Sequence, residues 1–194
     1  MANSFQTSSD TLRVLQHTQY HTEGILSPSN VAPEPLEQFR AWFTEASAKV
    51  SEPEVMTLST ATASGIPSAH NVLFKRVDST GFVFFTNYTS RKSRELLKNP
   101  NATLVFYWKE LRKQVRVLGR VEKLNKGDNE DYIITRPVRS QLGAWASKQS
   151  TVIGEGEIER RLEKYRGRFH VNEGDPSSTL IPAPDFWGGW RVIP

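Results

Sequence analysis

The sequence contains no cysteine, and this absence removes several kinds of chemistry at once. Disulfides, thiolate metal sites and a cysteinyl link to a cofactor are excluded, because each requires a thiol. Only two of the four histidines, His17 and His21, are closely spaced, and no cluster of carboxylates accompanies them. We therefore expect no metal site.

Long apolar runs are also absent. No stretch approaches the roughly 20 apolar residues that a membrane-spanning helix needs, and residues 1–10 are too polar for a secretory signal. The sequence therefore predicts a cytoplasmic protein without membrane contact, with a mitochondrial presequence as the weaker alternative. Neither a GxGxxG motif nor a P-loop is present, so a nucleotide would have to be held in another way.

The apolar pattern predicts a mainly β protein of the α+β class. Apolar alternation and turn residues predict strands at residues 55–62, 69–76, 82–86, 102–108, 114–123 and 190–193. Helical spacing predicts one helix that starts near Pro35 and three further helices over residues 90–99, 128–135 and 157–168. Short links between the first strands make neighbours antiparallel. We expect a small closed or split β-barrel with peripheral helices over residues 35–194, preceded by an extended, partly disordered arm over residues 1–34.

The most informative stretch is residues 136–150, which read Arg-Pro-Val-Arg-Ser-Gln-Leu-Gly-Ala-Trp-Ala-Ser-Lys-Gln-Ser. Arginine offers a rigid fork of donors to phosphate, and hydroxyls and amides can bind the edge of a ring. Glycine and alanine allow a close backbone approach. The mixture favours recognition of a planar, phosphorylated molecule.

Four other places carry a functional and a structural interpretation side by side. Ser90-Arg91-Lys92 stands at the start of a predicted helix. It fits either an anion-binding site or a serine that caps the helix beside two solvated cations. Lys75 ends an apolar strand, and Gln114 lies on an alternating strand; each fits a ligand contact or an ordinary surface position. Tyr132 and Arg136 are four residues apart, which suits a phosphate clamp with Ser140 or a surface pair.

In order and spacing, these segments resemble the pyridoxamine 5'-phosphate oxidases, an FMN enzyme family that makes pyridoxal 5'-phosphate. The resemblance runs from about residue 31 to residue 194 and rests on residues 72–75, 81–87, 90–92, 112–117, 136–150 and 186–192. It implies a split-barrel fold of the FMN-binding type and a homodimer. It also implies oxidation of pyridoxamine or pyridoxine 5'-phosphate by molecular oxygen, with hydrogen peroxide as the second product.

The resemblance assigns two groups of binding residues and no catalytic side chain, since the flavin carries the hydride transfer. The substrate phosphate would be bound by Lys75, Tyr132, Arg136 and Ser140. FMN would be bound by Phe85, Thr86, Arg91, Lys92, Gln114, Gln149 and Ser150.

Three departures from the family pattern bear on function, and one is His17, which stands where the family has an arginine three residues before a tyrosine, here Tyr20. The family has an arginine that helps to hold FMN where this chain has His70, which implies a weaker contact. The sequence also lacks the family's later Trp-Gln-Gly and Arg-Leu-His-Asp-Arg motifs. Their absence predicts an exposed sheet edge.

Two alternatives to the oxidase follow. The chain could bind FMN or pyridoxal phosphate with little or no turnover. The net charge of +4 and the aromatic strand at residues 106–108 leave a nucleic-acid-binding barrel as a third hypothesis, although no base-reading motif is present.

Overall fold

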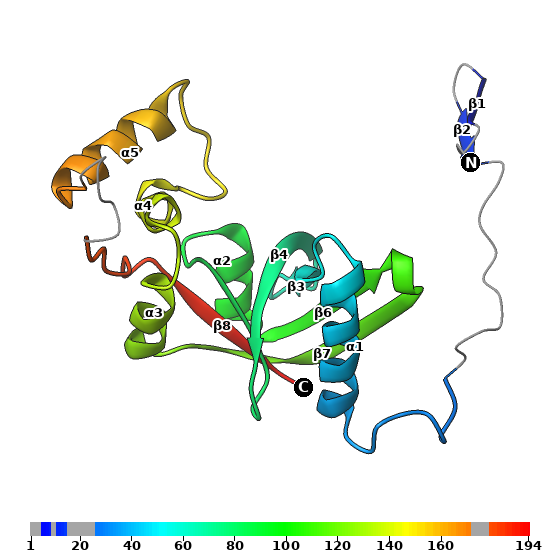
Figure 1. The fold of residues 1–194 in the computed structure, drawn as a ribbon. Helices are drawn as coiled ribbons and strands as arrows, with labels where there is room; N and C mark the ends of the chain where they lie inside the picture. Colours follow the sequence, from blue (N-terminus) through cyan, green and yellow to red (C-terminus); the bar gives the residue numbers. More distant parts are fainter. Residues whose placement is uncertain (1–4, 9–10, 15–25, 172–178) are drawn as a thin grey trace.

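Six antiparallel strands form a closed barrel in a computed structural model that describes residues 5–8, 11–14, 26–171 and 179–194 (Figure 1). Around the barrel the strand order is β3-β4-β5-β8-β7-β6. Their bounds are β3 Val55–Ala61, β4 Pro67–Val77, β5 Phe82–Asn87, β6 Asn101–Trp108, β7 Lys113–Lys123 and β8 Trp187–Ile193. This architecture confirms the predicted antiparallel barrel.

Among the described residues, five α-helices lie outside the barrel. They are α1 Pro35–Lys49, α2 Arg91–Lys98, α3 Lys126–Ile133, α4 Val138–Ala146 and α5 Glu157–Arg168, and a 3-10 turn at Lys109–Leu111 joins β6 to β7. In Figure 1, α1 lies on one side of the barrel, and α3, α4 and α5 lie on the other. No helix in the described part of the chain is long and apolar enough to cross a membrane.

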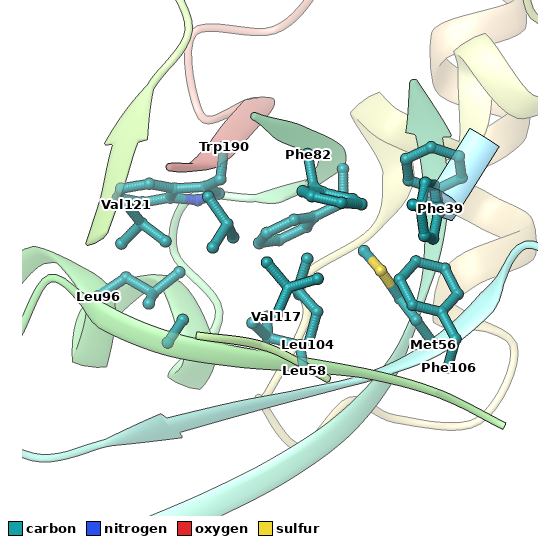
Figure 2. Close-up of a cluster of buried hydrophobic side chains, with 14 of the residues drawn as sticks. Phe39, Met56, Leu58, Phe82, Leu96, Leu104, Phe106, Val117, Val121 and Trp190 are labelled. Atoms are coloured by element: carbon teal, nitrogen blue, oxygen red, sulfur yellow. The ribbon is translucent and has the colours of Figure 1, made fainter. Parts of the chain in front are cut away.

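The barrel interior is filled by residues that alternate along each strand. On β6, Ala102, Leu104, Phe106 and Trp108 are buried, as expected where every second side chain faces the core. Helix α1 adds Phe39, whose ring centroid lies 4.8 Å from that of Phe82 and 5.1 Å from that of Phe106. Figure 2 shows these rings together with Met56 at one end of the core. Phe39 therefore attaches α1 to the barrel.

The predicted helix start at Pro35 and the predicted helix at Glu157–Arg168 are confirmed. Four elements differ most from prediction. The stretch before residue 147 forms α4, for which no helix was predicted, and β8 begins at Trp187 rather than at residue 190. Within the expected arm, β1 Phe5–Ser8 and β2 Thr11–Val14 form an antiparallel pair, while residues 15–25 lie outside the described part.

The expected open edge is confined to the first half of β7, because β8 pairs with β5 on one side and with Arg120–Lys123 of β7 on the other. Two glycines permit this closure. A Cβ on Gly188 would lie 2.3 Å from the Tyr88 hydroxyl, and one on Gly189 would lie 2.5 Å from Leu124 Cδ1. Within the described residues, the first half of β7 still pairs with β6 alone.

The role of Phe39 gives a stability test. Phe39→Ala removes a side chain that is only 3% exposed, and we expect it to lower the free energy of unfolding by about 3–5 kcal/mol. Val152→Ala, at a side chain that is fully exposed, is the control and should change it by no more than about 0.5 kcal/mol. Urea denaturation measures both. Equal effects would contradict the assignment of Phe39 to the core.

Candidate functional site: a cationic cavity where two strands separate

The candidate site begins where β4 separates from β5. The two strands pair at Phe74–Phe84 and at Arg76–Val83, so Lys75 is an extra residue in β4 that forms a bulge. Beyond the bulge, within the described residues, Pro67–Leu73 of β4 pair with β3 alone and Phe85–Asn87 of β5 with β8 alone. Bulges redirect side chains and end strand pairing. The barrel is therefore split at this point.

A cavity of about 520 Å³ occupies the split, within the range of roughly 300–1,000 Å³ that is usual for small-molecule sites. Eight of the eleven predicted binding residues line it: Lys75, Phe85, Thr86, Lys92, Tyr132, Arg136, Ser140 and Gln149. They come from β4, β5, α2, α3, α4 and the segments next to α4. Residues far apart in the sequence thus form one site.

Three cations line this cavity, and no carboxylate does. Burial lowers the pKa of Lys92, and burial is also the main cause of the lowered pKa values of Lys75 and Arg136. For Lys75, the nearby Glu54 opposes the shift and Arg136 adds to it. Partly desolvated cations without a counter-charge bind an anion strongly. The lining of the cavity is therefore suited to an anion.

One wall of the cavity is aromatic. The Phe85 and Tyr132 rings stack with their centroids 3.8 Å apart, and Trp187 stacks on Phe85 at 5.4 Å. The Arg136 guanidinium lies 5.3 Å from the centre of the Trp187 ring. Because α3 ends at Ile133, Tyr132 lies on this helix and Arg136 lies after it. The helix does not extend to Arg136, but Tyr132 and Arg136 line the same cavity, as predicted.

Specific hydrogen bonds fix the helices that carry these residues. The side chain of Asn129 on α3 accepts a bond from the Gly189 N–H of β8 at 2.8 Å. Gln141 on α4 donates to the Arg136 carbonyl at 2.7 Å, and Trp145 donates to the Pro182 carbonyl at 2.8 Å. The sequence between α3 and α4 is thereby held against the barrel.

The start of α2 forms the other end of the site. Ser90 is buried and caps the helix by accepting from the Ser93 N–H, which confirms the structural interpretation of this serine. Gln149 accepts bonds from Thr86 at 3.1 Å and from Lys92 at 3.4 Å. Ser150 accepts a bond from the Arg91 N–H at 3.0 Å. Arg91 and Ser150 are thus placed beside the cavity without lining it.

A buried carboxylate, Glu95, stands behind this end of the cavity. It accepts hydrogen bonds from Thr60 and Ser68, each at 2.5 Å, and from Arg91 Nε at 2.8 Å. Burial raises its pKa, but these bonds and the Arg91 charge outweigh burial and hold the pKa at about 2. Glu95 stays ionised and joins α2 to β3 and β4.

The structure does not bring Gln114 to the cavity. Gln114 is exposed on β7, opposite Tyr107 of β6. Conversely, the cavity includes Trp187, and Glu95 supports it, although neither was predicted as a site residue. Trp187 lies in the Trp-Gly-Gly segment, and Glu95 follows Arg91 by four residues, so both signals were present in the sequence.

The fold and the cavity together define a split barrel with an aromatic, cationic binding site. A family described as pyridoxamine 5'-phosphate oxidase matches residues 43–169. The pyridoxine/pyridoxamine 5'-phosphate oxidase of Cupriavidus taiwanensis is 48% identical over 173 residues, which cover 88% of this chain and 78% of the relative. The protein of the same name from a Nostoc species is 48% identical over 177 residues, covering 90% and 79%.

Solved structures agree with this class. PhzG from Burkholderia lata, in complex with tetrahydrophenazine-1-carboxylic acid, has a TM-score of 0.77 and 27% identity, covering 88% of this chain and 82% of that one. A pyridoxamine 5'-phosphate oxidase-related, FMN-binding protein from Nostoc punctiforme has a TM-score of 0.64 and 16% identity, covering 84% and 83%, and supports the fold. The chain belongs to the pyridoxamine 5'-phosphate oxidase family, and its cofactor is FMN.

Glu95 gives a pH-dependent stability test. Its pKa is lowered in the folded protein from 4.5 to about 2, so its stabilising contribution is complete above pH 4.5 and is lost as the pH falls toward 2. We expect Glu95→Gln to lower the free energy of unfolding at pH 7 by roughly 1–3 kcal/mol. The difference from the unaltered protein should narrow by about 1 kcal/mol by pH 4.

Urea denaturation at pH 7, 5 and 4 measures this difference. Glu110→Gln, on the exposed 3-10 turn, is the matched control and should follow the unaltered protein. A difference for Glu95→Gln that stays constant from pH 7 to pH 4 would contradict an ionised, hydrogen-bonded Glu95.

Proposed function

We propose that this chain oxidises pyridoxamine or pyridoxine 5'-phosphate to pyridoxal 5'-phosphate, with molecular oxygen as the electron acceptor and hydrogen peroxide as the second product. The observation that carries the proposal is the cavity at the split, which combines three cations with a stacked aromatic wall. Its chemistry suits a flat ring that bears a phosphate. The names of the relatives point to the same substrates.

The proposal divides the site between two ligands. Lys75, Tyr132, Arg136 and Ser140 would bind the substrate phosphate through an ammonium, a phenol, a guanidinium and a hydroxyl. FMN would be held by Phe85, Thr86, Arg91, Lys92, Gln149 and Ser150, and by Gln114. When bound, FMN supplies the hydride acceptor and the reaction with oxygen. The side chains position the ring and exclude water, and none is assigned as a nucleophile.

A homodimer is part of this proposal. Gln114 does not line the cavity of its own chain, so its assigned contact with FMN would come from a second copy. The strands β6 and β7 that carry it also expose apolar side chains, with Tyr107 54% exposed and Leu118 69% exposed. Such a surface suits contact with another subunit.

The second candidate function is binding of FMN or pyridoxal phosphate without turnover. Both candidates are tested by mixing the purified chain with FMN and pyridoxamine 5'-phosphate and measuring pyridoxal phosphate and peroxide. Equal amounts of the two products support the oxidase. Bound flavin without either product would favour the second candidate.

Lys75 gives a direct test of the substrate assignment. Lys75→Met removes a charged donor from the bulge, and a hydrogen bond from a charged group contributes roughly 1.5–3 kcal/mol. We expect KM for pyridoxamine 5'-phosphate to rise about 10- to 100-fold, with little change in the affinity for FMN. Steady-state kinetics and flavin fluorescence measure the two quantities.

The matched control is Lys109→Met, on the exposed turn between β6 and β7. It should leave both quantities unchanged. An unaltered KM in Lys75→Met, or an equal rise of KM in both variants, would contradict the assignment of Lys75 to the substrate site.

A further inference from the structure

One side chain beside the cavity has a polar atom that the protein leaves without a partner. His70 lies on β4, opposite Leu58 of β3 and next to the cavity residue Asn71. Its Nε2 atom is buried and makes no hydrogen bond with the described residues. A buried polar atom without a partner costs roughly 1–3 kcal/mol. The position therefore has an unmet capacity for one hydrogen bond.

The charged groups around His70 come from one element. Burial is the main cause of its lowered pKa, and the charges of Lys92 and Arg91 lower it further, while Glu95 raises it. All three charged residues belong to α2. The neighbouring strand β3 contains no titratable residue, and Ser68 on β4 is hydrogen-bonded to Glu95. Burial, two cations and one carboxylate thus act together on the pKa of the imidazole.

Glu95 is already committed to other donors. Its two oxygens accept hydrogen bonds from Thr60, Ser68 and Arg91, and none of these bonds comes from His70. The excess of positive charge around the imidazole is therefore not neutralised by the protein. An anion at this end of the cavity would supply both the missing hydrogen-bond partner and the missing charge.

We propose that His70 is a titratable ligand of the FMN phosphate, neutral before binding and protonated once the phosphate is bound. This inference rests on the FMN site described above. A proton taken from solvent adds to the imidazole, and Nε2–H then donates to a phosphate oxygen. The dianion raises the pKa of His70 because an opposite charge within about 4–6 Å favours the charged form. Binding of FMN is thus coupled to uptake of a proton.

The sign of the pH effect follows from this coupling. Protonated His70 favours the bound state, so its contribution to FMN affinity is complete at low pH and is lost as the pH rises through the pKa of the complex. The phosphate itself loses charge below its own pKa of about 6, which acts in the opposite direction. The contribution of His70 to FMN affinity is therefore measured as the difference between the unaltered protein and His70 variants, since the titration of the phosphate is the same in all of them.

The test is calorimetric titration of the full chain with FMN at pH 7, in two buffers that differ in ionisation enthalpy. We compare the unaltered protein with His70→Gln, which cannot be protonated, and with His70→Arg, which is always charged. The unaltered protein should take up as much as one proton more per FMN than either variant. Between pH 6 and pH 8 its affinity should fall on the order of tenfold relative to His70→Arg.

His170→Gln is the matched control, because His170 is exposed after α5; it should take up as many protons as the unaltered protein. Should His70→Gln fold poorly, the pKa of His70 can be followed by NMR in the unaltered protein, where it should rise on addition of FMN. Equal proton uptake in His70→Gln, or an unchanged pKa, overturns the inference while FMN binding stands. No FMN binding by the unaltered protein overturns the flavin site as well. FMN-bound protein without turnover contradicts only the proposed oxidase reaction.

Discussion

The site depends on the separation of β4 from β5 at the Lys75 bulge. A barrel of this size is otherwise filled by its own side chains, as the Phe39 cluster shows at the end of the core covered by α1 (Figure 2). The extra residue ends the pairing of the two strands, and the cavity opens between them. Closure of the barrel elsewhere is supplied by β8, whose glycines let α3 and Tyr88 approach closely. The barrel thus opens between β4 and β5 and is closed by the pairing of β8 with β5 and β7.

Charge is distributed around this split in two layers. The cavity surface carries Lys75, Lys92 and Arg136 without a carboxylate. Behind it, Glu95 is hydrogen-bonded to Arg91, Thr60 and Ser68, and these bonds keep it ionised. A buried anion in the second layer holds the strands and α2 together, but it does not neutralise the cavity surface. The site therefore retains a net attraction for an anionic group.

Most of the barrel could be predicted because alternation along a strand and turn residues are local signals. The α4 helix was missed, since Gly143 and the polar residues around it weaken the helical pattern. The resemblance to the family was what assigned the eight cavity-lining residues to one site. Their position at the split between β4 and β5 depends on the Lys75 bulge, which the sequence around Lys75 does not indicate. The unpartnered Nε2 of His70 and the role of Glu95 depend on contacts between distant segments. Only a three-dimensional structure reveals such contacts.

The central claim is that the split between β4 and β5 is a phosphate-binding flavin site. Comparing the affinities of FMN and riboflavin, by flavin fluorescence in low and high salt, tests it most directly, because the two ligands differ only in the phosphate. Two charge-assisted contacts to phosphate predict that FMN binds at least about 100-fold more tightly than riboflavin. They also predict that this advantage shrinks as salt is added. Equal affinities for the two flavins, or an advantage that salt does not change, would contradict the account.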